Sequence, residues 1–314
     1  MKKDSKIFIA GGQSGLVGTA IVRSLKKKGY TNIITRTRKE LNLLDGKQVE
    51  EFFKLEKPEY VFLAAAKVGG IIANKTEKAD FIYDNLQIQN NVIYNAWKYK
   101  VKKLMFLGSS CIYPKFSPQP IKEDYLLTGK LEETNDAYAV AKIAGIMMCQ
   151  SFHQQYGSNF ISVMPTNLYG PNDNFDLTHS HVLPAMIRKL HEAKVNKKKD
   201  VTLWGTGNVF REFLYVDDMA DACVYLMEKY NDPEIINIGT GEDLTIRELA
   251  ELVKEIVGFK GEIVWDTDKP DGTPRKKLDV ERLFKTGWKP KVKLEKGIKK
   301  EYDWFLNNYE TIRK

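Results

Sequence analysis

The sequence KIFIAGGQSGLVG, at residues 6–18, decides the fold of this chain. Its first five residues are typical of a short buried strand, and the chain beyond it favours an amphipathic helix. Between the two, Gly12, Gly15 and Gly18 follow the pattern Gly-x-x-Gly-x-x-Gly. Glycines at such a turn let the backbone approach a pyrophosphate, whose charge a helix N-terminus favours. Tight turns alone would also explain a glycine triplet, but its position after the first strand favours a dinucleotide site.

Strand-like and helical segments alternate through the first half of the chain. After the opening strand, the strand-like segments are 32–35, 59–66 and 103–107, and the helical segments are 49–55 and 80–99. This alternation predicts an α/β fold with a doubly wound parallel sheet of the Rossmann type. Ligands of such a sheet bind at the carboxyl ends of its strands, and Ser109 and Cys111 follow one of these strands.

The residues after the second strand indicate which dinucleotide the chain binds. NAD sites usually carry an acid here for the ribose hydroxyls, whereas arginine accommodates the 2′-phosphate of NADP. This chain has Arg36 and Arg38, and its first acid is Glu40. The pattern favours NADP(H), although two solvated arginines at a strand end would give the same sequence.

Tyr138 and Lys142 lie four residues apart in a helix-favouring segment. On a helix this spacing places both side chains on one face. A phenol with its ordinary pKa of about 10 is a poor proton donor at neutral pH, and an ammonium beside it would lower that pKa. The pair could therefore serve a carbonyl–alcohol reaction, although Tyr-x-x-x-Lys is also common on amphipathic surface helices.

Together these features resemble the extended short-chain dehydrogenase/reductase family. The glycine loop, Ser109 after a strand and the Tyr138/Lys142 pair carry the resemblance. It narrows at five further stretches, namely 64–71, 108–114, 164–171, 180–185 and 270–276. They are similar to the branch of the family that acts on GDP-4-keto-6-deoxy-D-mannose, epimerising carbons 3 and 5 and reducing carbon 4. The similarity extends over nearly the whole chain, from Ile7 to about Phe305.

The resemblance implies a chemical role for each of five residues. Tyr138 would protonate the oxygen on carbon 4, and Lys142 would hold the nicotinamide ribose and lower the pKa of the phenol. Ser109 would align the reacting oxygen. Epimerisation needs one group to remove a proton and another to return one from the opposite face. In the family these groups are a cysteine and a histidine, which fall here at Cys111 and His181.

The resemblance also implies binding residues for the cofactor NADP(H) and for the GDP-sugar. The cofactor residues are Gly12, Gln13, Ser14, Gly15, Leu16, Val17, Gly18, Arg36, Arg38, Leu107, Gly108, Ser109, Ser110, Tyr138, Lys142, Pro165, Thr166, Asn167, Leu168 and His181. The substrate residues are Lys189, Trp204, Arg211 and Asp271. Two positions depart from the family: Gln13-Ser14 replaces a stretch that often holds a basic residue, and Lys189 replaces a frequent arginine. No metal site is expected.

Several of these residues also have an ordinary structural interpretation. A single cysteine such as Cys111 is more often a small buried hydrophobic residue than a base. Trp204 could be a core aromatic residue, and Arg211 could form a surface ion pair with Glu212 or Asp217. Cys149 and Cys223 lie in apolar helical patterns and are predicted to belong to the core.

The chain is expected to fold as two domains. Residues 1–168 and about 211–239 would form the NADP(H)-binding domain. Residues from about 169 to 210 and from 240 to 314 would form a smaller α/β domain that binds the GDP-sugar. Within it, Thr245 and Glu248 form a capping-box pattern before a helix at 249–257.

Composition limits the partners and the compartment. The net charge is +8, but no DNA-binding signature accompanies the basic runs, so nucleic acid is not expected as a partner. The apolar runs are too short to span a membrane, and no secretory signal is visible. The three cysteines show neither metal-ligand spacing nor a paired framework, which fits a reducing cytoplasm. The family resemblance implies a homodimer through helices at 80–99 and 137–156.

Three functions remain open on the sequence. The first is the bifunctional epimerase/reductase that the resemblance implies. The second is a 4-reductase of a related GDP-4-keto-6-deoxy sugar, for example a heptose, with little or no epimerase activity. The third is a non-catalytic nucleotide-sensing module, against which the intact set of Ser109, Tyr138 and Lys142 argues.

Overall fold

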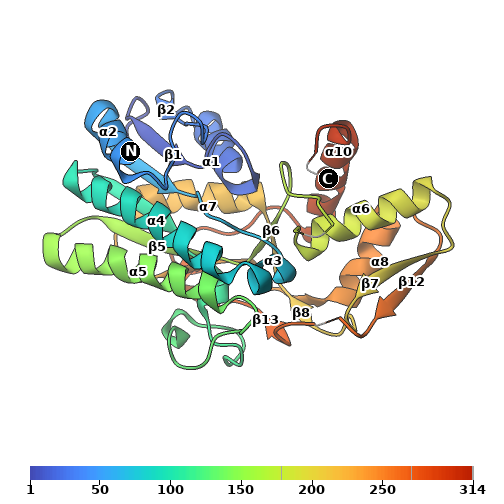
Figure 1. Ribbon diagram of the computed structural model, residues 1–314. Coiled ribbons are helices and arrows are strands. Elements are labelled where there is room, and N and C mark those ends of the chain that lie inside the picture. Colours follow the sequence, from blue (N-terminus) through green and yellow to red (C-terminus); the bar gives the residue numbers. More distant parts are fainter. Residues whose placement is uncertain (178, 270, 313–314) are drawn as a thin grey trace.

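The computed structural model describes residues 1–177, 179–269 and 271–312 of the chain (Figure 1). At its centre is a six-stranded parallel sheet with the strand order β10-β5-β4-β3-β1-β2. These strands are β1 (Ile7–Ala10), β2 (Ile33–Ile34), β3 (Tyr60–Leu63), β4 (Lys103–Leu107), β5 (Phe160–Pro165) and β10 (Ile236–Ile238). The predicted doubly wound parallel sheet is confirmed. Its order reverses between β1 and β3, and ligands bind at such a switch point.

Helices cover both faces of this sheet. One face packs on α2 (Gly46–Glu56), α4 (Lys78–Lys98) and α5 (Asp136–Tyr156), and the other on α1 (Leu16–Lys27) and α7 (Val216–Lys229). Side chains alternate between the two layers, so that Phe8 belongs to the first core and Ile9 to the second. Because the sheet is covered on both faces, most residues of its strands are apolar, without a regular alternation with polar residues.

A second lobe has its own apolar core and packs beside the sheet (Figure 1). Its helices are α6 (Val182–Val195), α8 (Ile246–Val257) and α10 (Leu294–Asn308), and its parallel strand pair is β7 (Asp200–Trp204) with β12 (Glu262–Asp266). The predicted capping box at the start of α8 is confirmed, with Thr245 and Glu248 bonded to each other's backbone.

Short elements connect the two lobes. β6 (Asn167–Tyr169) pairs with β9 (Phe213–Tyr215), and β8 (Phe210–Arg211) lies between β11 (Leu244–Thr245) and β13 (Arg275–Lys276). The remaining short helices are α3 (Ile71–Thr76), η1 (Ser110–Ile112), η2 (Glu123–Tyr125) and α9 (Glu281–Lys285). Cys149 and Cys223 are fully buried, as predicted. In the described part of the chain, none of the helices combines the length and apolarity that crossing a bilayer requires.

Candidate active site

A cavity of about 1110 Å³ lies between the two lobes. It is lined by the loop after β1, by the segments after β3, β4 and β5, and by the segment leading into α6. All the site residues predicted from the sequence line this cavity except Gly12. Pro270, the first residue of one of the stretches that carried the family resemblance, lies outside the described residues.

The glycine loop closes tightly over the start of α1. A Cβ on Gly18 would lie 2.0 Å from the carbonyl oxygen of Gly11, so the helix can pack this closely only on a glycine. Gly15 takes the N-cap position with a φ of 82°, which side chains rarely adopt. Gly12 instead packs inward, because a Cβ there would lie 2.6 Å from Cγ2 of Thr35. The loop therefore brings the amino end of α1 to the cavity wall, an arrangement that suits a phosphate group.

The two arginines after β2 have different surroundings. Arg36 donates to Glu56 Oε1 at 2.6 Å and to the carbonyl oxygen of Thr35 at 2.9 Å. Arg38 is exposed at the cavity rim. Arg38 is therefore the better placed of the two to receive a phosphate, because Arg36 is already engaged in an ion pair.

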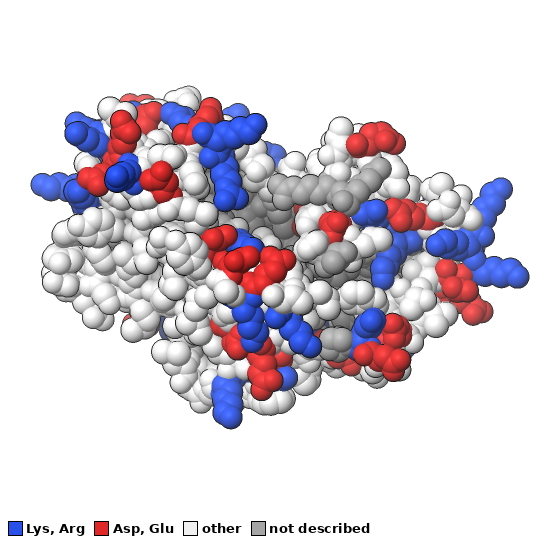
Figure 2. Space-filling model, viewed as in Figure 1, with Lys and Arg blue, Asp and Glu red and all other residues white. Residues whose placement is uncertain are grey.

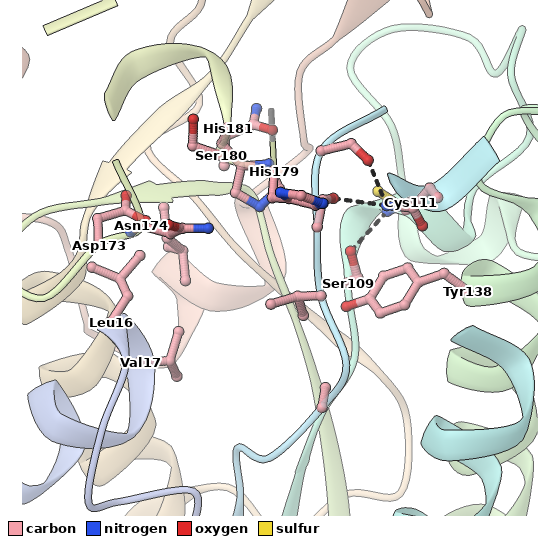
Figure 3. A pocket seen from close by; sticks show the side chains of 18 of the residues that line it. Leu16, Val17, Ser109, Cys111, Tyr138, Asp173, Asn174, His179, Ser180 and His181 are labelled. Carbon is pink, nitrogen blue, oxygen red and sulfur yellow. Dashed lines mark hydrogen bonds between the residues drawn. The ribbon is translucent and has the colours of Figure 1, made fainter. Parts of the chain in front are cut away.

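Helix α5 carries Tyr138 and Lys142 on the face that borders the cavity. Lys142 Nζ donates to the carbonyl oxygen of Leu107 at 2.8 Å and lies 5.7 Å from the centre of the Tyr138 ring. Figure 3 shows the Tyr138 hydroxyl beside Ser109. Burial lowers the pKa of Lys142 to about 7. Burial also raises the pKa of Tyr138, as does the negative charge of Cys111, while the Ser109 hydroxyl acts in the opposite direction.

The prediction that Lys142 lowers the pKa of Tyr138 is wrong for the protein by itself. Burial disfavours the charge on both groups, so the amine tends to neutrality and the phenol keeps its proton. A neutral phenol can donate a proton when negative charge develops beside it.

Cys111 has the opposite electrostatic surroundings. It lies in η1, where the backbone N–H of Cys111 donates to Ser109 Oγ at 3.2 Å. Lys276 Nζ donates to Cys111 Sγ at 3.2 Å. Burial alone would raise the pKa of the thiol, but Lys276, Ser109 and Arg211 outweigh it, and the pKa of Cys111 is lowered. A lowered pKa increases the thiolate fraction, which is the form that acts as a base.

His181 occupies the N-cap position of α6 and lines the same cavity. His181 is exposed to solvent in the open cavity, and partial desolvation by the cavity walls, together with the charge of Lys276, lowers the pKa of its imidazole. Lys276 thus influences both groups that the family resemblance implicates in epimerisation. No local sequence pattern connects Lys276 with Cys111, because the two lie 165 residues apart along the chain.

The predicted substrate residues surround the end of the cavity in the second lobe. Trp204 is 45% exposed, so its interpretation as a core residue is wrong. Lys189 Nζ lies 5.3 Å and Lys269 Nζ 5.7 Å from the centre of the Trp204 indole. An aromatic face with cations beside it suits a base attached to a diphosphate.

Arg211 bonds to backbone rather than to an acid. It donates to the carbonyl oxygens of Phe210 at 2.7 Å and of Asp271 at 3.2 Å. The alternative of an ion pair with Glu212 or Asp217 is wrong: Glu212 accepts backbone N–H groups, and Asp217 pairs with Arg23 at 2.6 Å. Arg211 therefore keeps a positive charge at the cavity wall, and no carboxylate of the described residues forms an ion pair with it.

Asp271 lines the cavity and also has a structural role. Its carboxylate accepts the backbone N–H and the hydroxyl of Thr206, both at 2.8 Å. It lies against Gly205, where a Cβ would lie 2.2 Å from its Oδ1. The carboxylate thus fixes the turn that follows Trp204. Nothing in the sequence distinguished this role from a direct contact with a sugar.

A family model and relatives of known function match this chain. A family model described as "NAD dependent epimerase/dehydratase family" matches residues 7–239. The chain is 60% identical to GDP-L-fucose synthase 1 of Arabidopsis thaliana, over 98% of this chain and 94% of the other.

Two solved structures are also similar. A GDP-6-OMe-4-keto-L-xylo-heptose reductase from C. jejuni has a TM-score of 0.94 and 43% identity, with 98% of this chain and 99% of the other covered. A GDP-L-fucose synthetase from Naegleria fowleri bound to NADP has a TM-score of 0.91 and 31% identity, with 100% and 98% covered.

Proposed function

The chain belongs to the NAD dependent epimerase/dehydratase family, and we propose that it converts GDP-4-keto-6-deoxy-D-mannose to GDP-L-fucose with NADPH. The reaction comprises epimerisation at carbons 3 and 5 and reduction at carbon 4. The observation that carries the proposal is the convergence of two proton-transfer sets on one cavity. Tyr138 with Ser109 forms one set, and Cys111 with His181 forms the other.

The reduction uses the first set. Bound NADPH supplies the hydride that reduces carbon 4. The Tyr138 hydroxyl gives its proton to the oxygen on that carbon, and its raised pKa keeps the proton in place until charge develops there. Ser109 hydrogen-bonds the same oxygen and fixes its direction. Lys142, which is held by the Leu107 carbonyl, would bind the ribose of the cofactor.

The epimerisation uses the second set. The ketone at carbon 4 acidifies the C–H bonds at carbons 3 and 5. The Cys111 thiolate removes such a proton and becomes a thiol, and the electron pair of the C–H bond moves onto the ketone oxygen. His181 in its protonated form returns a proton from the opposite face and becomes neutral. Lys276 favours the thiolate that begins this sequence.

The end of the cavity beside the glycine loop suits NADP(H), and the end beside Trp204 suits a GDP-sugar. The glycine loop and the amino end of α1 fit the pyrophosphate of the cofactor, and Arg38 fits a 2′-phosphate. Trp204 provides a face for guanine, with Arg211 and Lys189 available for the diphosphate. The relative of known structure bound to NADP supports the same choice of cofactor.

A second candidate is a 4-reductase of a GDP-4-keto heptose with little epimerase activity. The similarity to the heptose reductase from C. jejuni favours it. Against it are the higher identity to a GDP-L-fucose synthase and the contact of Lys276 with Cys111, which a simple reductase does not need. The bifunctional reaction is therefore the better supported of the two.

We propose two domains, a homodimer and a cytoplasmic location. Residues 1–168 and about 211–239 would hold the cofactor, and about 169–210 and 240–314 the sugar. Large apolar side chains are exposed on α4 and α5, namely Tyr83, Tyr94, Val140, Met147 and Tyr156. Figure 2 shows that the surface over these helices carries few charged groups. A second copy packing on this face would bury it. The three free thiols suit a reducing compartment.

The proposal is tested by supplying NADPH with a panel of GDP-4-keto sugars. The expected result is oxidation of NADPH with GDP-4-keto-6-deoxy-D-mannose and formation of GDP-L-fucose, identified by NMR. Preferred turnover of a GDP-4-keto heptose to a product that keeps its configuration at carbons 3 and 5 would establish the second candidate instead. Absence of NADPH oxidation with every sugar of the panel would overturn both and revive a non-catalytic role.

A further inference from the structure

We propose that Asn237, in the edge strand β10, is a positioning residue that holds the Lys276 ammonium against the Cys111 thiol. The inference rests on the proposed function, in which Cys111 is the base of the epimerisation. Asn237 does not line the cavity. It would therefore act through the segment after Cys111 and the segment after Lys276, to both of which it is hydrogen-bonded.

The contact between Lys276 and Cys111 joins two segments outside the central sheet. Cys111 lies in η1 and Lys276 in the two-residue strand β13. A hydrogen bond of 3.2 Å to sulfur weakens quickly if either backbone shifts. The position of each segment must therefore be set by contacts other than this bond itself.

On the Cys111 side, Asn237 holds the chain through Tyr113. The Tyr113 hydroxyl donates to Asn237 Oδ1 at 2.6 Å, and both residues are buried. Tyr113 follows Cys111 by two residues and ends η1, so this bond fixes the direction in which the cysteine loop leaves β4.

On the Lys276 side, the amide nitrogen of Asn237 makes two bonds. Nδ2 donates to the carbonyl oxygens of Asp279 and Ile121, each at 3.0 Å. Ile121 is bonded to the same segment, because its N–H donates to the Lys277 carbonyl at 2.7 Å and its carbonyl accepts the Asp279 N–H at 2.8 Å. The amide of Asn237 thus closes a small hydrogen-bonded unit that carries Lys276.

Two buried carboxylates hold this unit in place. The Asn237 backbone N–H donates to Glu123 Oε1 at 2.9 Å, and the Leu278 N–H donates to Glu212 Oε2 at 2.8 Å. Asn237 is fully buried between Ile236 and Ile238, where an apolar side chain would be the ordinary choice. A buried amide with both its oxygen and its nitrogen bonded specifies one arrangement of the segments around it.

Besides Glu132 and its ion-pair partner Lys115, which border a small pocket beside Cys111, four ionisable groups among the described residues surround the thiol, and Lys276 has the main effect. Lys276 and Arg211 favour the thiolate, and Tyr138 is coupled to it electrostatically. His181 lines the same cavity and is itself affected by Lys276. Of these, Lys276 makes the direct hydrogen bond, and Asn237 holds the segment of Lys276 but not the other three.

The test is the pH dependence of Cys111 alkylation by iodoacetamide in the full chain, followed by peptide mass spectrometry. Lys276→Met should move the midpoint upward by about one pH unit, because a lost ion-pair partner raises a thiol pKa by roughly that amount. Asn237→Ser should move it in the same direction. Tyr113→Phe removes only the hydroxyl bonded to Asn237 and should shift the midpoint less. If Asn237→Ser does not fold, Tyr113→Phe is the variant that tests the inference. Lys277→Met, with the same loss of charge one residue further along, should leave the midpoint unchanged.

The second readout is deuterium exchange at carbons 3 and 5 of the GDP-4-keto sugar. Near neutral pH, Asn237→Ser should slow exchange about tenfold, and raising the pH to about 9 should restore most of it, since more thiolate forms. A lower melting temperature with an unchanged alkylation profile in both Asn237→Ser and Tyr113→Phe would overturn the inference. If the wild-type protein exchanges no deuterium while the alkylation midpoints shift as stated, the proposed function fails and the positioning role stands.

Discussion

The reduction half and the epimerisation half of the cavity hold their ionisable groups in opposite surroundings. Around Lys142 lie the Leu107 carbonyl and the face of Phe106, 4.9 Å from Nζ to the ring centre. Burial there raises the pKa of Tyr138 and lowers that of Lys142. Around Cys111, Lys276 and Arg211 outweigh burial and lower the pKa of the thiol.

The difference indicates that the two reactions depend on the cofactor to different degrees. The protein itself supplies the cation that prepares Cys111 for proton removal. In the proposed mechanism, Tyr138 would stay neutral and would give up its proton only as negative charge develops on the oxygen at carbon 4. We therefore expect epimerisation to proceed without NADPH. We also expect that a substitution can abolish either activity while the other remains.

The largest effect is expected from Tyr138→Phe. Removing the proton donor should slow NADPH oxidation by roughly a thousandfold, the usual contribution of a general acid. Deuterium exchange at carbons 3 and 5 should fall far less, because Ser109 still bonds the ketone oxygen. Tyr156→Phe, at the other end of α5, is the matched control and should change neither rate. If Tyr138→Phe lost reduction and deuterium exchange to the same extent, the assignment of separate residues to the two reactions would be wrong.

Cys111→Ser should give the complementary result. Exchange should fall by about a hundredfold or more, because an alcohol is a much weaker base than a thiolate at neutral pH. Reduction of a 4-keto sugar that already has the final configuration at carbons 3 and 5 should continue at nearly the wild-type rate. Cys149→Ala, buried in α5 away from the cavity, controls for the loss of a thiol. A variant that still exchanges at the wild-type rate would show that another group is the base.

Arg38→Ala should affect the reduction half alone. Losing the cation at the cavity rim should raise the KM for NADPH about tenfold and leave the KM for NADH unchanged, because only NADPH carries the 2′-phosphate. Arg36→Ala should have a smaller effect, since Arg36 is bonded to Glu56. Steady-state kinetics with both cofactors provide the measurement, and an equal rise in the KM of both cofactors would contradict the assignment.

The smallest effect is expected for the stability change at Glu301. Like Tyr138 and unlike Cys111, this group has a pKa that burial raises. Burial and the neighbouring Asp173 carboxyl raise the pKa of Glu301 well above its usual range. The folded chain thus keeps a proton that the unfolded chain loses above about pH 4.3, and the wild-type protein loses stability as the pH rises through this window.

Glu301→Gln removes that ionisation. The variant should therefore be more stable than the wild type by about 1 kcal/mol near pH 8, with the gain vanishing near pH 4, where the carboxyl is protonated in both states. Urea unfolding at both pH values measures the difference. Asp303→Asn, exposed on the same helix, is the control and should show little change. A gain of the same size at both pH values would contradict a raised pKa.

The two halves also differ in how far they can be predicted from the sequence. Tyr138 and Lys142 lie on one turn of one helix, so their spacing alone predicts that they meet. The glycine loop follows its strand directly, and its position is equally local. Cys111 and Lys276 are 165 residues apart, and only the folded chain shows that they touch. The family resemblance implied roles for Cys111 and His181, but it implied none for Lys276.

The errors have physical causes of the same kind. The pKa of Tyr138 was predicted from the nearness of an ammonium, but the outcome depends on how deeply both groups are buried. The bonds of the Asp271 carboxylate to Thr206, a partner 65 residues away, were likewise not predicted. Burial and long-range hydrogen bonds are properties of the tertiary structure, and no local pattern encodes them.

The most direct test of this account is deuterium incorporation from D₂O into GDP-4-keto-6-deoxy-D-mannose by the wild-type protein freed of NADP(H). The account predicts that carbons 3 and 5 both acquire deuterium, at a rate that rises with pH as Cys111 becomes thiolate. Incorporation that requires NADPH, or that is absent at both carbons, would contradict it.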